Sequence, residues 1–204
     1  MLKVLIGTPI HICKDYAMER WLENVSKLSY PANLLMIDNS PNPDYIERVR
    51  EYCEKYNIKN YKIEHLALDQ KLSSDMRINV AQEVLRRKIL ASNYDAWFSW
   101  ECDQLIPNNT LNELIRLMEI VSCKMALHNC WARYDSKSPM TDMGCTFIPK
   151  EYLEKTRFLP ECNGEIDLDE SNRYKNTFKA RILRDGGNFI EAFGIIVPIY
   201  HLDK

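Results

Sequence analysis

The chain has 204 residues, of which 46% are hydrophobic and 27% are charged, which suits one globular domain with a substantial core. Its formal net charge is −2 and it has no block of Lys and Arg, so we expect no nucleic-acid partner. No apolar segment approaches the roughly 20 residues that cross a bilayer, so we expect no transmembrane segment.

Strand-like and helix-like segments alternate through the first two thirds of the chain. In chain order we expect a strand over residues 2–6, a helix over 14–28, a strand over 33–37, a helix around 45–52, a strand over 61–68, a helix around 78–89, a strand over 96–100 and a helix from Thr110. The Thr110-x-x-Glu113 spacing is typical of a capping box. This alternation predicts βαβ units and a mostly parallel central sheet flanked by helices.

The pattern loosens after residue 122, although no linker or repeat divides the chain. We expect further strands over residues 124–128, 145–149, 178–183 and 194–200, a short helix over 150–156 and another helix over 169–175. The whole chain, residues 1–204, is therefore predicted to be a single α/β domain with a Rossmann-like sheet.

The seven cysteines are scattered along the chain and odd in number. The N-terminus enters a strand-like segment without the features of a secretory signal, so we expect free thiols in a reducing, cytoplasmic environment. A zinc site from Cys123, His128, Cys130 and Cys145 is conceivable. The chain has no CxxC pair, however, and small buried core residues are the better interpretation.

Residues 95–107 are the most informative segment. An apolar run over 96–100 ends at two acids, Glu101 and Asp103, and a proline and a helix start follow. Ligands of parallel α/β sheets bind beyond the carboxyl ends of the strands. If the segment is extended there, Glu101 and Asp103 share one face and Cys102 points away. The acid pair is then placed to hold a cation against a ligand.

Polar residues also follow the first two predicted strands. Thr8 and Pro9 end the first strand, and Asp38 and Asn39 end the second. Because the carboxyl ends of parallel strands lie at one edge of a sheet, we expect these residues to meet the acid pair there.

In order along the chain, these motifs resemble those of the GT-A glycosyltransferases, particularly the inverting family-two type. The resemblance covers nearly the whole length and rests on an opening strand at 4–9, a second strand with its terminal acid at 35–40, an Arg/Asn helix start at 77–79, an Asp-x-Asp-like motif at 100–103, an acceptor-side strand at 143–148, an acidic segment at 164–167 and a late histidine segment at 200–202.

The resemblance implies a GT-A (nucleotide-diphospho-sugar transferase) fold. Residues 1–107 would form the nucleotide-sugar-binding half and residues 108–204 the acceptor-side half. The implied activity moves a sugar from a UDP-, GDP- or dTDP-sugar to a hydroxyl of a glycan, protein or lipid-linked acceptor. The implied contacts with the nucleotide sugar come from Thr8, Pro9, Asp38, Asn39, Arg77 and Glu101.

The resemblance also implies a divalent metal ion, Mn²⁺ or Mg²⁺, because carboxylate oxygens suit both ions. Asp103 would coordinate it directly, Glu101 would contact the metal or the ribose, and a His201 ligand would favour Mn²⁺. Asp167 is the leading candidate for the general base of an inverting transfer, and Glu165 is the second.

The chain departs from the family pattern at two places. Glu101 stands where the first Asp is usual, and Ile166 separates Glu165 from Asp167. Glu101 is one methylene longer than Asp, which implies rearranged metal and ribose contacts, and the interrupted acidic segment offers two candidates for the base, Asp167 and Glu165.

Ordinary structural roles compete with these assignments. The acid pair could be a solvated turn before a helix, Asp38 could form a simple Asx turn, and Thr8-Pro9 a strand-end turn. Arg77 and His201 could be surface residues, and Glu165 and Asp167 could belong to a solvated acidic loop.

Cys102 carries a thiol and Trp131 an aromatic ring, so each has a conceivable role at the site. We do not expect Cys102 to act as a nucleophile, because carboxylates on both sides raise the pKa of a thiol. Trp131, beside Arg133, could stack on an acceptor sugar.

Two other functions stay open. A nucleotidyltransferase shares parallel strands and acid pairs, but residues 7–11 lack the Gly-rich, basic phosphate loop typical of that class. A non-catalytic nucleotide- or sugar-binding module is also compatible with Glu101 and the interrupted acidic segment.

Overall fold

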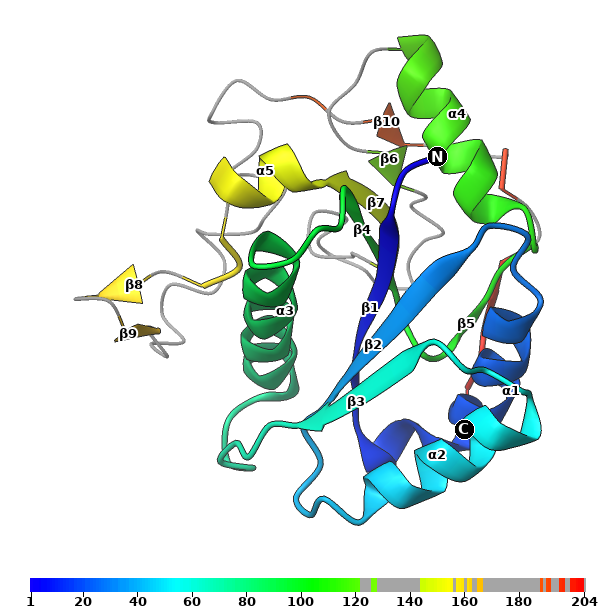
Figure 1. Ribbon diagram of the computed structural model, residues 1–204. Helices are drawn as coiled ribbons and strands as arrows, with labels where there is room; N and C mark the ends of the chain where they lie inside the picture. The colour runs from blue at the N-terminus through cyan, green and yellow to red at the C-terminus, as the bar shows by residue number, and fades with distance from the viewer. Residues whose placement is uncertain are drawn as a thin grey trace.

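A seven-stranded sheet with helices on both faces organises the computed structural model of this chain (Figure 1). The structure describes residues 1–121, 126–127, 144–155, 157–159, 161–162, 165–166, 188, 190–191, 195–196 and 199–203. The strands are β1 (Val4–Ile10), β2 (Ala32–Asp38), β3 (Tyr61–His65), β4 (Ala96–Trp100), β5 (Gln104–Leu105), β6 (Ala126–Leu127), β7 (Cys145–Pro149), β8 (Glu161–Cys162), β9 (Glu165–Ile166), β10 (Ile190–Glu191) and β11 (Tyr200–His201). The helices are α1 (Asp15–Ser26), α2 (Tyr45–Lys55), α3 (Ser74–Leu90), α4 (Thr110–Val121) and α5 (Lys150–Lys155), with a 3₁₀ turn, η1 (Ile12–Lys14), before α1.

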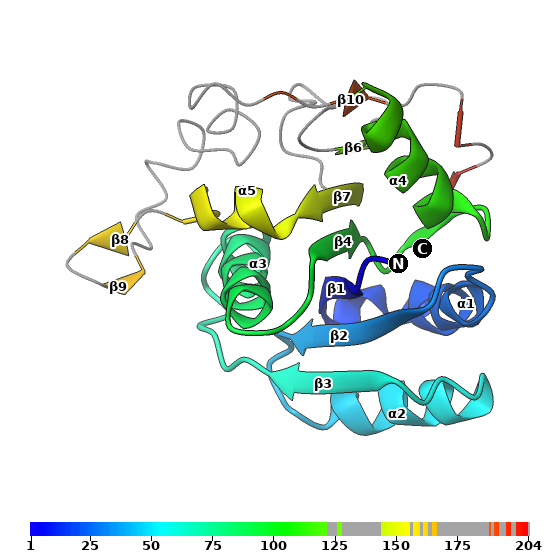
Figure 2. The same ribbon diagram turned by 45° about the horizontal axis from the view of Figure 1, so that its top comes forward.

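The strand order places the carboxyl ends of the first four strands together. The sheet runs β10-β6-β7-β4-β1-β2-β3, and β1 pairs in parallel with both β2 and β4 while β2 pairs in parallel with β3. Strand β7 is antiparallel to both of its neighbours. The prediction of a mostly parallel α/β sheet is therefore confirmed, and β1 to β4 end at one edge. Figure 2 shows the order β7-β4-β1-β2-β3 across the sheet.

Alternating side chains along the strands fill two core layers. Val4, Ile6 and Phe98 belong to a cluster with residues of α1, α2 and α4, whereas Leu5 and Trp97 belong to a second cluster with residues of α3 and α5. This is the period of two that a strand buried on both faces requires. Each face of the sheet therefore has its own set of covering helices.

Strand β1 continues to Ile10, four residues beyond its predicted end. The sequence Gly7-Thr8-Pro9 suggests a turn, but the pairing of β1 with β4 stops at Gly7 opposite Ser99. The Ile10 carbonyl accepts from Asn39 N, at 3.0 Å, so Ile10 points its polar backbone toward β2. Backbone groups face alternate sides along a strand, so the nitrogen of Pro9 faces the β4 side, where the pairing has already ended at Gly7. The N–H that proline lacks therefore costs no hydrogen bond of the sheet.

The order and type of the elements predicted up to residue 121 are confirmed, with shifted ends. The capping box is wrong, because the Thr110 hydroxyl donates to Pro107 O at 2.7 Å while the Glu113 carboxylate pairs with Arg116. The predicted strand over 194–200 is also wrong where it is described: Ile195 and Ile196 lie in a turn and bend, and the strand begins at Tyr200. The predicted elements at 169–175 and 178–183 lie outside the described residues.

Among the helices that the structure describes, none is long and apolar enough to cross a bilayer.

A buried ion pair within α3 is hydrogen-bonded to the backbone of α5. Glu83 is 1% exposed and Arg86 is 5% exposed, and their charged groups lie 2.8 Å apart. Arg86 Nε also donates to Leu153 O at 2.7 Å, and the second carboxylate oxygen of Glu83 accepts from Phe158 N at 2.9 Å. Both charges are thus compensated, as burial demands.

We expect Arg86→Ala to lower the free energy of unfolding by about 3–5 kcal/mol, because it leaves the Glu83 carboxylate buried without its closest cation. Urea denaturation followed by circular dichroism measures this loss. Arg87 pairs with the same carboxylate from a side chain that is 45% exposed. Its replacement by Ala is the matched control and should cost less than about 1 kcal/mol. Equal losses of unfolding free energy in the two variants would contradict the conclusion that Arg86 is the main cation compensating Glu83.

Candidate functional site

The turn after β4 sends the two predicted acids into different environments. Glu101 is 48% exposed at its side chain, whereas Asp103 is 2% exposed. Residues 102 and 103 form a turn rather than an extension of β4, closed by a hydrogen bond from Gln104 N to Glu101 O at 3.2 Å. The extended segment that would place both acids on one face is therefore absent, although Cys102 points into the core with 4% exposure. The acids therefore form one fixed and one accessible carboxylate.

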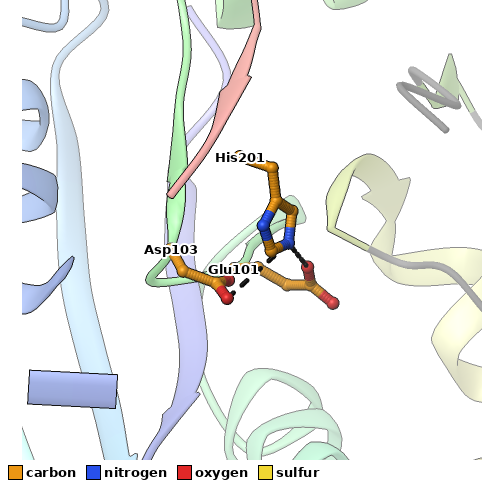
Figure 3. A group of neighbouring side chains, drawn as sticks. All are labelled: Glu101, Asp103 and His201. Atoms are coloured by element: carbon orange, nitrogen blue, oxygen red, sulfur yellow. Dashed lines mark ion pairs between the residues drawn. The ribbon is translucent and has the colours of Figure 1, made fainter. Parts of the chain in front are cut away.

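His201 joins the two acids from the far end of the chain. Strand β11 pairs antiparallel with β5, and Leu202 N donates to Asp103 O at 2.7 Å. His201 Nε2 lies 3.6 Å from Asp103 Oδ2 and 3.8 Å from Glu101 Oε2, and Figure 3 shows the imidazole directed at both carboxylates. One ligand atom from each residue lies within 4.8 Å of the others. Two carboxylates and an imidazole at this spacing are a suitable donor set for Mn²⁺ or Mg²⁺, with the nitrogen favouring Mn²⁺.

Two residues at the start of α1 also contact Asp103. Lys14, the N-cap residue of α1, forms an ion pair with Asp103 Oδ2, and Tyr16 Oη donates to the same oxygen at 3.3 Å. Burial lowers the pKa of the Lys14 ammonium, but the hydrogen bond and charge of Asp103 outweigh that effect and the pKa lies above its usual value. The start of α1 also carries partial positive charge. The negative charge of Asp103 is thus stabilised on several sides.

The side chain of Gln104 orients Glu101. Gln104 is 1% exposed, and its Nε2 donates to Glu101 Oε2 at 3.2 Å. Gly144 makes room for this amide, since a Cβ at residue 144 would lie against Nε2 and 2.9 Å from Cδ. The Gly144 carbonyl in turn accepts from Glu101 N at 2.8 Å. The end of β4 and the start of β7 therefore hold Glu101 together.

A second polar cluster lies at the carboxyl ends of β1, β2 and β3. Asp38 is fully buried, and its Oδ1 accepts from Ser40 N at 3.1 Å and Ser40 Oγ at 2.5 Å. Its Oδ2 lies 2.8 Å from Nδ1 of His65, its neighbour on β3. Ser40 Oγ also accepts from Ile12 N at 2.8 Å. Asp38 thus forms the Asx-type turn and also binds the histidine beside it.

The loop between β3 and α3 crosses this cluster. Gln70 Nε2 donates to Asn39 O at 3.1 Å, and Gln70 Oε1 lies 3.4 Å from His11 Nε2. Arg77 donates to the carbonyls of Gln70, at 3.0 Å, and Leu72, at 2.7 Å. Its Nε is buried and has no hydrogen-bond partner in the described part of the chain. Arg77 therefore holds this loop.

The predicted residues thus divide into three sets. Glu101, Asp103 and His201 meet, and Lys14 connects them to the segment that follows β1. Asp38 and Asn39 lie buried at the ends of neighbouring strands, and Thr8 is buried within β1 close to them. Pro9 is partly exposed beside them. For Glu165 only the backbone, in β9, is described, and Asp167 and Trp131 lie outside the described residues.

Of the four residues considered as zinc ligands, the structure describes one. Cys145 is a fully buried core residue, while Cys123, His128 and Cys130 lie outside the described residues.

The sequence interpretation missed Lys14, Tyr16, His65 and Gln104. A signal was available for His65 alone, since a residue at the end of the next parallel strand lies beside Asp38.

Comparison with solved structures finds similar folds at low sequence identity. TarS from S. aureus, in complex with UDP-GlcNAc, matches at 12% identity and a TM-score of 0.55 over 75% of this chain and 47% of that chain. The mannosyltransferase PcManGT from Pyrobaculum calidifontis, in complex with GDP-Man and Mn²⁺, matches at 13% identity and a TM-score of 0.65 over 95% of this chain and 55% of that chain. This chain spans about half the length of either protein.

The likeness establishes the fold. The mixed α/β sheet flanked by helices is the GT-A fold, as the sequence motifs predict. No protein-family model matches the sequence, and neither does any curated protein.

The Cys102 thiol is expected to be unreactive. Burial, followed by the charge of Asp103, raises its pKa far above the usual range. Iodoacetamide at pH 8 with peptide mapping by mass spectrometry should therefore modify the exposed Cys13 and leave Cys102 unmodified in the native protein, with both modified in urea. Rapid native labelling of Cys102 would contradict the geometry and reopen its role as a nucleophile.

Proposed function

We propose that this chain is a metal-dependent glycosyltransferase that moves a sugar from a nucleoside-diphosphate sugar to a hydroxyl acceptor with inversion. The observation that carries the proposal is the meeting of Glu101, Asp103 and His201 at the carboxyl edge of a GT-A sheet. Two proteins of the same fold were solved with UDP-GlcNAc and with GDP-Man and Mn²⁺. Both are nucleoside-diphosphate sugars, whose phosphates a divalent cation at this edge would bind.

In this proposal Asp103 is the fixed metal ligand, and Glu101 and His201 complete the set. A divalent ion held there supplies Lewis-acid stabilisation of the charge that develops on the departing diphosphate, worth several kcal/mol. Asp103 is suited to the fixed role because the Asp103 backbone is tied to Leu202 and its carboxylate to the start of α1. Glu101, which is half exposed, can follow the donor, with Gln104 orienting its carboxylate.

The nucleoside is proposed to lie over the ends of β1, β2 and β3. Pro9 is partly exposed at this edge, Thr8, Asp38 and Asn39 lie buried close to it, and Arg77 supports the loop that crosses it. Because the Asp38 carboxylate is buried against Ser40 and His65, we propose that it acts mainly by orienting the His65 ring, which is 20% exposed. A histidine with one nitrogen fixed by a carboxylate offers the other to a base edge or ribose hydroxyl.

The acceptor hydroxyl requires a general base in an inverting transfer. Asp167 is proposed for this role and Glu165 is the second candidate. The acceptor itself, a glycan, a protein or a lipid-linked hydroxyl, is left open by this chemistry.

A non-catalytic nucleotide-binding module is the second candidate. The observation that favours it is the Lys14 ammonium on Asp103 Oδ2, which supplies a cation to the carboxylate from within the chain. Measurement of turnover separates the two functions.

Incubation with UDP-, GDP- and dTDP-sugars plus Mn²⁺ should reveal slow hydrolysis of one donor, measured by release of the nucleoside diphosphate. Asp103→Asn should reduce this rate more than about 100-fold, because it removes the charge that holds the metal ion. Asp44→Asn, which changes an exposed aspartate without a side-chain capping bond, is the matched control and should keep the rate. Nucleotide binding without turnover of any donor would favour the module.

Once an acceptor is identified, Asp167→Asn should slow transfer by about 10²- to 10⁴-fold, the usual contribution of a general base, with donor affinity unchanged. Glu165→Gln provides the comparison at the neighbouring acid. NMR of the product should show an inverted anomeric centre. Retained configuration together with an active Asp167→Asn variant would refute both the base and the inversion.

A further inference from the structure

The Lys14 ammonium contacts the carboxylate oxygen of Asp103 that the proposed function assigns to the metal ion. Its ammonium contacts Asp103 Oδ2, the same oxygen that lies 3.3 Å from Tyr16 Oη and 3.6 Å from His201 Nε2. The Asp103 side chain is 2% exposed, while the Lys14 side chain is 34% exposed. The carboxylate is therefore fixed, and the lysine reaches it from the accessible side.

An ammonium group and a divalent ion compete for this oxygen. A carboxylate oxygen has two lone pairs, and both Lys14 and Tyr16 contact Asp103 Oδ2, so a divalent ion that binds this oxygen must replace one of these donors. The ion pair is partly exposed and its lysine stem is flexible, so its rupture requires movement of one side chain and no change in the backbone. Lys14 follows β1 by four residues, at the edge where a donor diphosphate would meet Asp103.

We propose that Lys14 is a displaceable internal cation. It neutralises Asp103 while the site lacks its donor, and it moves onto the donor diphosphate when the divalent ion takes its place on Asp103. This inference rests on the proposed function, since it assigns a role within the same site.

The exchange makes metal and nucleotide bind cooperatively. A divalent ion that arrives alone must displace Lys14 and leave its charge without a partner, so it binds weakly. A nucleoside diphosphate provides the displaced ammonium with phosphate oxygens, so each ligand strengthens the binding of the other by the same factor.

The test measures Mn²⁺ binding from the EPR signal of free Mn²⁺, with and without UDP or GDP, so it does not depend on turnover. Lys14→Met keeps a side chain that is only one atom shorter and removes its charge. Without nucleotide it should bind Mn²⁺ at least tenfold more tightly than the wild type, and the strengthening of Mn²⁺ binding by nucleotide should fall at least tenfold. Lys14→Arg, which keeps a cation at this position, should stay within about threefold of the wild type without nucleotide.

Lys55→Met is the matched control, because it removes a lysine from an exposed ion pair with Glu19 and changes the net charge equally. Lys55→Met should leave the Mn²⁺ affinity unchanged both with and without nucleotide. Lys14→Gln is measured as a second uncharged variant, and circular dichroism checks the fold of each variant.

Wild-type and Lys14→Met proteins that bind Mn²⁺ equally in the absence of nucleotide would overturn the exchange while leaving the metal site intact. Absence of Mn²⁺ binding in the wild type even with nucleotide, and in Lys14→Met, would overturn the proposed metal function and the exchange with it. The two failures are therefore distinguishable.

Discussion

The buried negative charge of Asp103 sets the arrangement of this edge of the molecule. A carboxylate out of contact with water is costly unless cations and donors surround it. Here the start of α1 brings Lys14 and Tyr16, and β11 brings His201, to one oxygen. A pair of this kind adds little stability relative to apolar residues of similar size. Its presence is therefore better understood through what Asp103 does than through what it contributes to folding.

Parallel pairing explains how segments far apart in sequence reach that charge. Because β1, β2, β3 and β4 run in one direction, the residues that follow them emerge at one edge, and short connections keep them there. The turn after β4 carries Asp103, and the segment after β1 carries Lys14. The end of β2 carries Asp38, tied to the segment after β1 through Ser40 and Ile12 N. The metal side and the nucleoside side of the proposed site thus share one backbone scaffold.

The sequence predicted the parts of this arrangement that have a period or a local motif. Apolar alternation and helical spacing identified the sheet and its covering helices, and the acid pair after β4 stood out because it ends a buried run. Strands β5 and β11 are two residues long, too short for any period, so no local pattern predicts that they pair, and only the family resemblance linked His201 to the acid pair. Lys14 lies 89 residues from Asp103, and a single charge after a strand carries no local signal of such a partner. The strand predicted over 194–200 failed because apolar composition alone does not distinguish a strand from a turn, here one in which Ile195 is 48% exposed and Ile196 is buried.

The shape of the turn accommodates Glu101, which stands where the motif that the sequence resembles has an aspartate. Residues 102 and 103 leave the strand direction at once, so Glu101 and Asp103 do not project in parallel as they would from an extended segment. The additional methylene lets the Glu101 carboxylate cover that difference, and its Oε2 comes within 3.8 Å of His201 Nε2 while it accepts from Gln104. A shorter side chain at residue 101 would reach less far toward His201. Glu101 in place of an aspartate is thus compatible with the proposed metal site, in which a rigid aspartate would fix the ion and a longer, exposed glutamate would adapt to the ligand.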